Sequence, residues 1–289
     1  MGGATRFVRW NQTPRLLSTE PRMMRRTALS GGGPEARGVV TMDIQRLATV
    51  YPELQAGGFS RVDGTVAFYV RVNALLGGIG PAAVVLDYGA GRGAFLEDPV
   101  RFRRDLRRLR GKCERIVGID IDDAVLRNPA LDEAHVVHSG ERLPLDDASI
   151  DLVVTDHTFE HVTDPAWVAS ELDRVLRPGG WLCARTPNRW GYIGIGARAV
   201  PNKLHAGFLG RLQPTKRPED TFPTVYRLNT PGALKRWFST QRYHHVVYAA
   251  DSEPVYVGRS MTAARLSRIA FALTPPPLRS VLYVFLEKR

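Results

Sequence analysis

One run of residues, in which a strand ends in a carboxylate and a glycine-rich turn, most constrains how this chain can fold. Residues 84–86 are β-favouring aliphatics, Asp87 follows them, and glycines then occupy positions 89, 91 and 93. Residues 94–96 can begin a helix. Glycine accepts positive φ and lets backbone N–H groups approach a ligand closely. The run therefore predicts a strand, a tight turn and a helix N-terminus that together bind a nucleotide.

Two acids indicate which kind of nucleotide this turn binds. Asp87 lies two residues before the first glycine, where its charge would repel a pyrophosphate and favour a cation. A second predicted strand, residues 115–120, ends in Asp120, which can accept both hydroxyls of a ribose. The glycines alone also satisfy the dinucleotide fingerprint, so the acids make the distinction. Together they predict a nucleoside that carries positive charge.

Two further motifs follow in order, Leu143-Pro144-Leu145-Asp146 and Leu176-Arg177-Pro178-Gly179-Gly180. With them, residues 84–188 resemble the class I S-adenosylmethionine-dependent methyltransferases, particularly the type 11 branch. Four ordered motifs are more specific than one glycine turn. The resemblance implies an α/β, Rossmann-like, doubly wound sheet of seven strands with the last strand antiparallel. It also implies S-adenosylmethionine as cofactor and methyl transfer as the activity.

The resemblance also implies which residues contact the cofactor. The expected contacts are Asp87, Tyr88, Gly89, Ala90, Gly91, Gly93, Asp120, Ile121, Glu141, Arg142, Leu143 and Asp156. Ile121 is expected against the adenine, and backbone groups near Leu143 are expected to hold that base. The family commonly binds the adenine amine with an aspartate, and Ser139 stands in its place here. Glu141 is the candidate substitute.

Two histidines are the candidates for the chemical step. Residues 149–157 predict a fourth strand that delivers Asp156 and His157 to the ligand edge of the sheet. The resemblance places residues just after this strand near the transferable methyl group, so His157 or His161 is a candidate base or substrate-positioning group. Capping or packing of the next helix is the alternative for His161. We predict no metal site, because neither a third ligand nor a helix accompanies the pair.

Composition bounds the remaining possibilities. A chain of 289 residues with 44% hydrophobic residues can bury one α/β domain with one elaboration. No run approaches the roughly eighteen apolar residues of a membrane span. Two cysteines, Cys113 and Cys183, predict a reducing compartment, the cytoplasm, rather than a disulfide framework. The net charge of +11 admits nucleic acid, acidic lipid or an anionic metabolite as partner, or an arginine-rich proteome.

The first part of the chain divides into a tail and a domain. Residues 1–41 are rich in arginine and lack an apolar period, so we expect a disordered tail. A targeting segment or an over-extended start are the alternatives. Residues 42–289 form the predicted methyltransferase domain. Its first helix is expected over residues 61–76, and Tyr51, Phe59 and Tyr69 are candidate lid contacts, with core packing as the alternative for each.

Two insertions enlarge the predicted core. Asp120 follows Asp87 by 33 positions, more than the ~20 of a compact βαβ unit. We expect a helix there that begins at Asp98-Pro99, with apolar residues on one face. The other face carries Arg101, Arg103, Arg104, Arg107, Arg108 and Arg110, interpreted as solvated or, alternatively, as phosphate-binding. Residues 189–228 are the second insertion, expected to cover an acceptor that bears carboxylate or phosphate.

The C-terminal part is expected to complete the sheet. Residues 231–238 and 261–273 predict helices, and residues 243–248 and 281–286 predict the last two strands. Residues 266–286 are alternatively a membrane-surface segment, which would give peripheral membrane contact without a span.

The predicted function is methyl transfer to a small molecule, at an oxygen of a sugar or other polar or anionic metabolite. Three alternatives stay open. A nucleic-acid methyltransferase would use the arginine-rich helix, and a non-catalytic binding module is suggested by Ser139. A nicotinamide-dependent oxidoreductase would share the glycine turn but leaves Asp87 unexplained. The sequence identifies neither the acceptor nor the oligomeric state.

Overall fold

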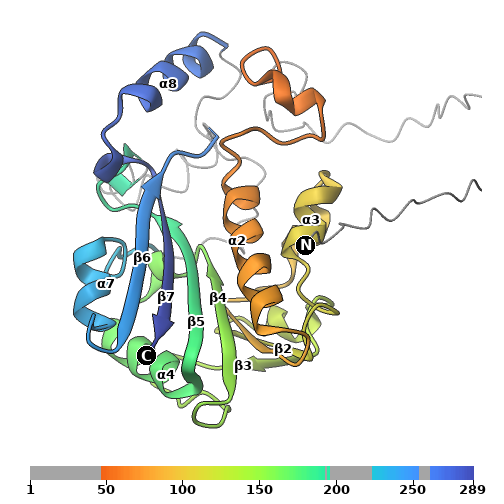
Figure 1. Ribbon diagram of the computed structural model, residues 1–289, viewed down its shortest axis with the longest axis vertical. Coiled ribbons are helices and arrows are strands. Elements are labelled where there is room, and N and C mark those ends of the chain that lie inside the picture. Colours follow the sequence, from red (N-terminus) through yellow and green to blue (C-terminus); the bar gives the residue numbers. More distant parts are fainter. Residues whose placement is uncertain (1–46, 193, 196–222, 254–260) are drawn as a thin grey trace, which may run out of the picture. The chain divides into compact units, whose positions relative to one another are not determined.

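The computed structural model describes residues 47–192, 194–195, 223–253 and 261–289 (Figure 1). The predicted N-terminal tail and most of the predicted acceptor cover therefore lie outside the described residues. Within them, no helix is long and apolar enough to cross a membrane.

The fold is built on a seven-stranded sheet with the order β3-β2-β1-β4-β5-β7-β6 (Figure 1). Its strands are β1 Val84–Tyr88, β2 Arg115–Asp120, β3 Glu133–Val136, β4 Ile150–Asp156, β5 Leu176–Pro187, β6 Tyr243–Ala250 and β7 Val281–Lys288. The first five pair in parallel, whereas β7 pairs antiparallel with both β5 and β6. The predicted seven strands with an antiparallel last strand are confirmed.

Helices cover both faces of this sheet (Figure 1). The α-helices are α2 Gly64–Ile79, α3 Arg101–Arg107, α4 Pro165–Val175, α7 Pro231–Trp237 and α8 Met261–Leu273. Short 3-10 helices are η1 Pro52–Gln55, η2 Ala94–Glu97, η3 Asp123–Arg127, η4 Phe159–His161 and η6 Pro276–Leu278. One hydrophobic cluster joins α4 and α7 to one face, and a second joins α2 to the other. This two-sided burial explains why β1, β4 and β7 are rich in aliphatic residues.

Local capping explains where several helices begin. The Asp164 side chain accepts hydrogen bonds from the first two free N–H groups of α4, and Thr230 accepts one from Ala233 of α7. In both helices proline follows the cap, where its missing N–H costs nothing. The start of α7 at Pro231 is as predicted from the sequence.

The first insertion differs from its prediction. Helix α3 begins at Arg101 rather than at Asp98-Pro99. The carboxylate of Asp98 accepts a hydrogen bond from the Val100 backbone and a two-pronged ion pair from Arg103. Because these contacts hold the chain in an extended turn, Asp98 stabilises the approach to the helix and not its first turn.

Candidate functional site

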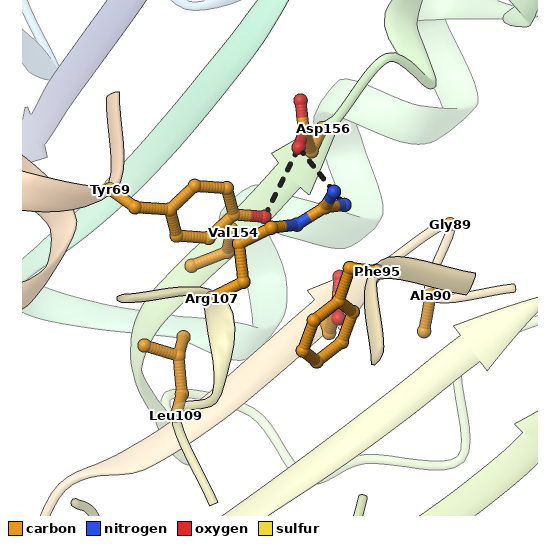
Figure 2. Close-up of a pocket in the computed structure, with 9 residues that line it drawn as sticks. Tyr69, Gly89, Ala90, Phe95, Arg107, Leu109, Val154 and Asp156 are labelled. Atoms are coloured by element: carbon orange, nitrogen blue, oxygen red, sulfur yellow. Dashed lines mark hydrogen bonds and ion pairs between the residues drawn. The ribbon is translucent and has the colours of Figure 1, made fainter. Parts of the chain in front are cut away.

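A pocket opens at the carboxyl ends of β1 and β4, the edge where an open α/β sheet places ligands. Its walls come from α2, the glycine turn, η2, the segment around α3, and β4. The lining residues are Tyr69, Asp87, Gly89, Ala90, Phe95, Arg107, Leu109, Val154 and Asp156 (Figure 2). Four of them, Asp87, Gly89, Ala90 and Asp156, were predicted as cofactor contacts.

The glycine turn is packed so closely that side chains are excluded from it. Gly89 has φ +82°, and a Cβ built on it would lie 2.1 Å from Oγ1 of Thr158. Gly93 has φ +78°, and its Cβ would lie 2.4 Å from Oδ1 of Asn128. Glycine alone meets both the conformational and the steric demand at these positions. The turn is therefore held tightly against its neighbours, and the N–H groups of Gly89 and Ala90 both donate to the Ile119 carbonyl.

Asp120 is oriented by the same turn. Its Oδ2 accepts a hydrogen bond from the Gly91 N–H at 2.8 Å, and its Oδ1 accepts one from the Asp122 N–H at 3.0 Å. These bonds fix the carboxylate at the end of β2, the position from which an acid can bind a ribose. The next side chain, Ile121, is largely exposed and offers an apolar surface beside it.

Asp87 is the carboxylate with the most perturbed titration in the pocket. Burial raises its pKa to about 7; Asp156 and Asp120 add to the rise, and the guanidinium of Arg107 opposes it. No hydrogen bond holds its carboxylate within the described part of the chain. An incompletely compensated carboxylate favours a bound cation. The residue therefore fits the positively charged ligand that the sequence predicts.

Arg107 and Tyr69 line the same pocket as Asp87. Figure 2 shows both side chains reaching Asp156, with the Tyr69 hydroxyl donating to Oδ2 at 3.2 Å and Nη2 of Arg107 3.4 Å from it. The Arg107 guanidinium also lies over the rings of Tyr69 and Phe95, 5.5 and 5.0 Å from their centroids. Its Nε is buried without a hydrogen-bond partner among the described residues. An anionic group entering the pocket would supply that partner.

The interpretation of the inserted helix as a solvated basic face is wrong for two of its arginines. Arg107 lines the pocket. Arg103 is largely buried between Asp63 and Asp98, 3.0 and 2.8 Å from their carboxylates. The sequence pattern could not distinguish these residues from exposed neighbours, because packing against α2 determines which arginines turn inward.

A buried ion pair supports the wall of the pocket at Asp156. Arg185 forms two hydrogen bonds with Asp156, Nε to Oδ1 at 2.7 Å and Nη2 to Oδ2 at 2.8 Å. Burial opposes ionisation of Asp156, but Arg185 and Arg107 outweigh it and hold its pKa below the ordinary value. Asp156 thus lines the pocket with its carboxylate already engaged. Whether it also contacts the cofactor stays a prediction.

Sequence reasoning missed Arg185, although a signal was present. Asp156 ends β4, Arg185 lies two residues before the end of β5, and the two are register partners in the β4–β5 ladder. Opposite charges at two aligned strand ends could have indicated the pair.

Residues 141–143, in the segment predicted to hold adenine, form contacts with other parts of the protein. The Leu143 side chain is buried in the core, and its N–H donates to Oε2 of Glu171 at 2.8 Å. The Glu141 carboxylate accepts from the His138 N–H at 2.8 Å, and Arg142 pairs with Asp147. None of these three residues lines the pocket, so the structure does not bring them to the other predicted contacts. Ile121 does not line the pocket either, so its contact with the base stays a prediction.

Tyr88, another predicted cofactor contact, is bonded to Thr158 through its backbone. Its carbonyl accepts a hydrogen bond from Oγ1 of Thr158 at 3.3 Å, while its half-buried side chain packs against the core. Of the three candidate lid aromatics, Tyr69 alone lines the pocket. Tyr51 is buried in a small separate cluster, and Phe59 stacks on Phe102 with centroids 5.0 Å apart.

His157 is held by a buried carboxylate. Its Nδ1 lies 3.2 Å from Oε1 of Glu160, and Oε2 of Glu160 accepts a hydrogen bond from Thr186 at 2.9 Å. Burial disfavours the charged form of Glu160, but the hydrogen bond and charge of His157 outweigh it and lower its pKa. His157 also has φ +59°, a strained conformation for a non-glycine residue. The imidazole is thus oriented at the end of β4, half-exposed and next in the chain to the pocket residue Asp156.

His161 has a different environment. Its Nδ1 lies 2.9 Å from the carbonyl oxygen of Pro223, where the chain returns from the second insertion. Asp164, not His161, caps α4, so the capping alternative is wrong. Among the described residues, no group of three or more His, Cys, Asp or Glu side chains could hold a metal ion.

Comparison with known proteins shows which protein family this chain resembles. Residues 86–184 match the methyltransferase domain family. A probable S-adenosylmethionine-dependent methyltransferase of Mycolicibacterium smegmatis is 43% identical over 82 residues, 27% of this chain and 31% of that protein. The trans-aconitate 2-methyltransferase of Azoarcus sp. is 27% identical over 198 residues, 61% of this chain and 75% of that protein.

A malonyl-[acyl-carrier protein] O-methyltransferase of Marinomonas sp. is 29% identical over 160 residues, 51% of this chain and 56% of that protein. The chain spans about a third of the length of the M. smegmatis relative. The matched domain and the strand order agree with the resemblance to class I S-adenosylmethionine-dependent methyltransferases that the sequence motifs indicate.

Proposed function

We propose that this protein transfers a methyl group from S-adenosylmethionine to an oxygen atom of a small polar or anionic metabolite. The observation that carries the proposal is His157, oriented by buried Glu160 at the carboxyl end of β4. The pocket residue Asp156 directly precedes it in the chain. Two relatives support the acceptor class, since one is named for trans-aconitate and another as an O-methyltransferase.

The pocket offers a group for each part of the cofactor. Asp87 faces the cationic part, Asp120 is oriented for the ribose hydroxyls, and Ile121 presents an apolar surface for the base. The unpartnered Nε of Arg107 suits the carboxylate of the amino-acid part. When bound, S-adenosylmethionine supplies a methyl group on a sulfonium.

The contribution of the protein to the chemical step is orientation and proton removal. Holding two reactants in line accounts for much of the rate of such a displacement. A hydroxyl acceptor also loses a proton. With Nδ1–H donating to Glu160, the Nε2 of His157 has a lone pair that can accept this proton. A carboxylate acceptor needs no base, so the effect of removing His157 reports the acceptor class.

A panel of hydroxyl and carboxylate acceptors with methyl-labelled cofactor tests the proposal. For a hydroxyl acceptor, His157→Gln should lower kcat by about 10²–10⁴-fold and leave the cofactor Kd unchanged. Glu160→Gln should lower kcat less, because the imidazole stays but loses the charge of its carboxylate partner. If the double variant of His157 and His161 to Gln retains the full rate with a hydroxyl acceptor, the role of these histidines as bases is wrong.

The alternatives receive less support. Several arginines of the first insertion already pair with acids, as in Arg101 with Asp105 and Arg110 with Asp132, which leaves fewer charges for nucleic-acid phosphates. Binding to RNA that weakens steeply with salt would revive that alternative. Failure to bind S-adenosylmethionine in isothermal titration would instead favour a non-catalytic module, and preference for a nicotinamide cofactor would favour an oxidoreductase.

A further inference from the structure

Helix α8 has one face that is docked on the protein. Ala264 is fully buried in the cluster formed with Val50, Tyr51 and Leu54. Nη1 of Arg268 donates to the Val50 carbonyl at 2.9 Å. Phe271 stacks on Tyr192 with ring centroids 5.4 Å apart. These contacts fix the rotation of the helix, and so determine which residues face outward.

The outward face is apolar. Leu266, Ile269 and Leu273 follow helical spacings of three and four and are 60%, 58% and 77% exposed. Leu278, in the 3-10 helix that follows, is 48% exposed. Isolated exposed leucines are ordinary, but a continuous stripe on a helix marks a surface that contacts something apolar. We call Leu266, Ile269, Leu273 and Leu278 the α8 stripe.

The charges around the α8 stripe indicate its partner. Residues 261–286 contain arginines at 265, 268 and 279 and no aspartate or glutamate, although Arg279 pairs with Asp251 at 3.6 Å. Exposed Arg265 borders the stripe. A second copy would bring the same positive charges together. The segments 1–46, 196–222 and 254–260 of this chain also carry more basic than acidic residues, so they would not complement it either.

We propose that the α8 stripe docks this protein on the surface of an anionic lipid bilayer. A helix with leucines on one face and arginines beside it lies in the interface, with its apolar side chains in the acyl boundary and its cations at the headgroups. The position suits this role, because the Asn188 amide donates to the carbonyls of Pro277 and Arg279 at 2.8 Å. These bonds tie the segment after α8 to the end of β5, at the ligand edge of the sheet. The proposal does not depend on the proposed methyl transfer.

Vesicle flotation of the full chain tests this proposal. The vesicles are phosphatidylcholine alone, or phosphatidylcholine with about a third phosphatidylglycerol. We expect binding to the anionic vesicles that weakens when salt is raised from 0.1 to 0.5 M. The double variant Ile269→Glu with Leu273→Glu should lower the partition coefficient at least tenfold. Arg265→Glu should lower it about tenfold on anionic vesicles.

Leu126→Glu is the matched control, since Leu126 is 59% exposed on η3 and lies outside the α8 stripe. It should bind vesicles like the unchanged protein. Circular dichroism and S-adenosylmethionine binding of each variant report whether the fold is intact, and Arg265→Glu keeps the test valid if the double variant unfolds. The proposal is overturned if no vesicle binds, if the double variant binds as well as the control, or if the α8 stripe instead forms a lipid-independent dimer that the double variant dissociates.

Discussion

The two sides of the pocket are built in different ways. On the cofactor side, the strand-turn unit from Asp87 to Gly93 and the end of β2 at Asp120 are short contiguous segments that bond to each other. On the side that we propose faces the acceptor, Tyr69 and Arg185 come from distant parts of the chain and converge on Asp156, to which Arg107 also extends from the first insertion. The first side depends on local backbone conformation, whereas the second depends on the packing of the whole domain. Substitutions on the first side should therefore mainly weaken cofactor binding, and those on the second side should mainly lower the stability of the fold.

The largest effect is expected from Arg185→Met on the acceptor side. Removing the guanidinium leaves the buried Asp156 carboxylate without its main counter-charge, which should lower the free energy of unfolding by about 3–5 kcal/mol. Urea denaturation measures this. The control Arg101→Ala removes a highly exposed ion pair and should change stability by less than about 0.5 kcal/mol. Equal effects of the two substitutions would contradict the description of the acceptor side.

Gly89→Ala should instead affect the cofactor side. The added Cβ would meet the Thr158 side chain and take a strained φ, so we expect about 100-fold weaker S-adenosylmethionine binding. Gly111→Ala is the matched control, because Gly111 has φ +84° but nothing within 4 Å of its built Cβ. Isothermal titration distinguishes the two. Similar affinities in both variants would show that close packing at Gly89 is unimportant for binding.

Arg107→Met probes the contact between the two sides. If the buried Nε binds the cofactor carboxylate, its loss removes a charge-assisted hydrogen bond and should raise the cofactor Kd at least about tenfold. Arg108→Met, at the exposed end of α3, should leave the Kd unchanged. Tighter binding by Arg107→Met would mean that the guanidinium competes with the cofactor for the carboxylates.

The smallest effect concerns pH. Because the pKa of Asp87 is raised to about 7, its carboxylate gains a proton below that pH and loses its attraction for a cation. The affinity for S-adenosylmethionine should fall about tenfold between pH 8 and pH 6. Asp87→Asn should remove this dependence and bind weakly at both values. A pH-independent affinity in the unchanged protein would show that Asp87 does not face the cationic part.

Much of the fold could be predicted because its signals are local. The aliphatic runs of the strands, and the caps Asp164 and Thr230 before proline, need only neighbouring residues. The turn residues Gly89 and Gly93 and the carboxylate of Asp120 follow from the same kind of signal.

The features that the sequence did not predict depend on contacts between distant segments of the chain. The predicted start of α3 was wrong because the Asp98 carboxylate pairs with the Arg103 side chain and does not cap the helix. In the segment predicted to hold adenine, the Leu143 N–H donates to Glu171, 28 positions further along the chain, a contact that the local sequence does not indicate. The burial of Arg107 depends on packing against α2, which no short pattern of arginines records.

The position of β7 has a consequence for synthesis of the protein. This strand leaves the ribosome after every other strand, yet it fills the space between β5 and β6. Until it arrives, β5 has an open edge and β6 has no neighbour in the sheet. Open edges rich in aliphatic residues can pair with other chains. During translation the nascent domain is therefore exposed to misassociation until its final eight-residue strand closes the sheet.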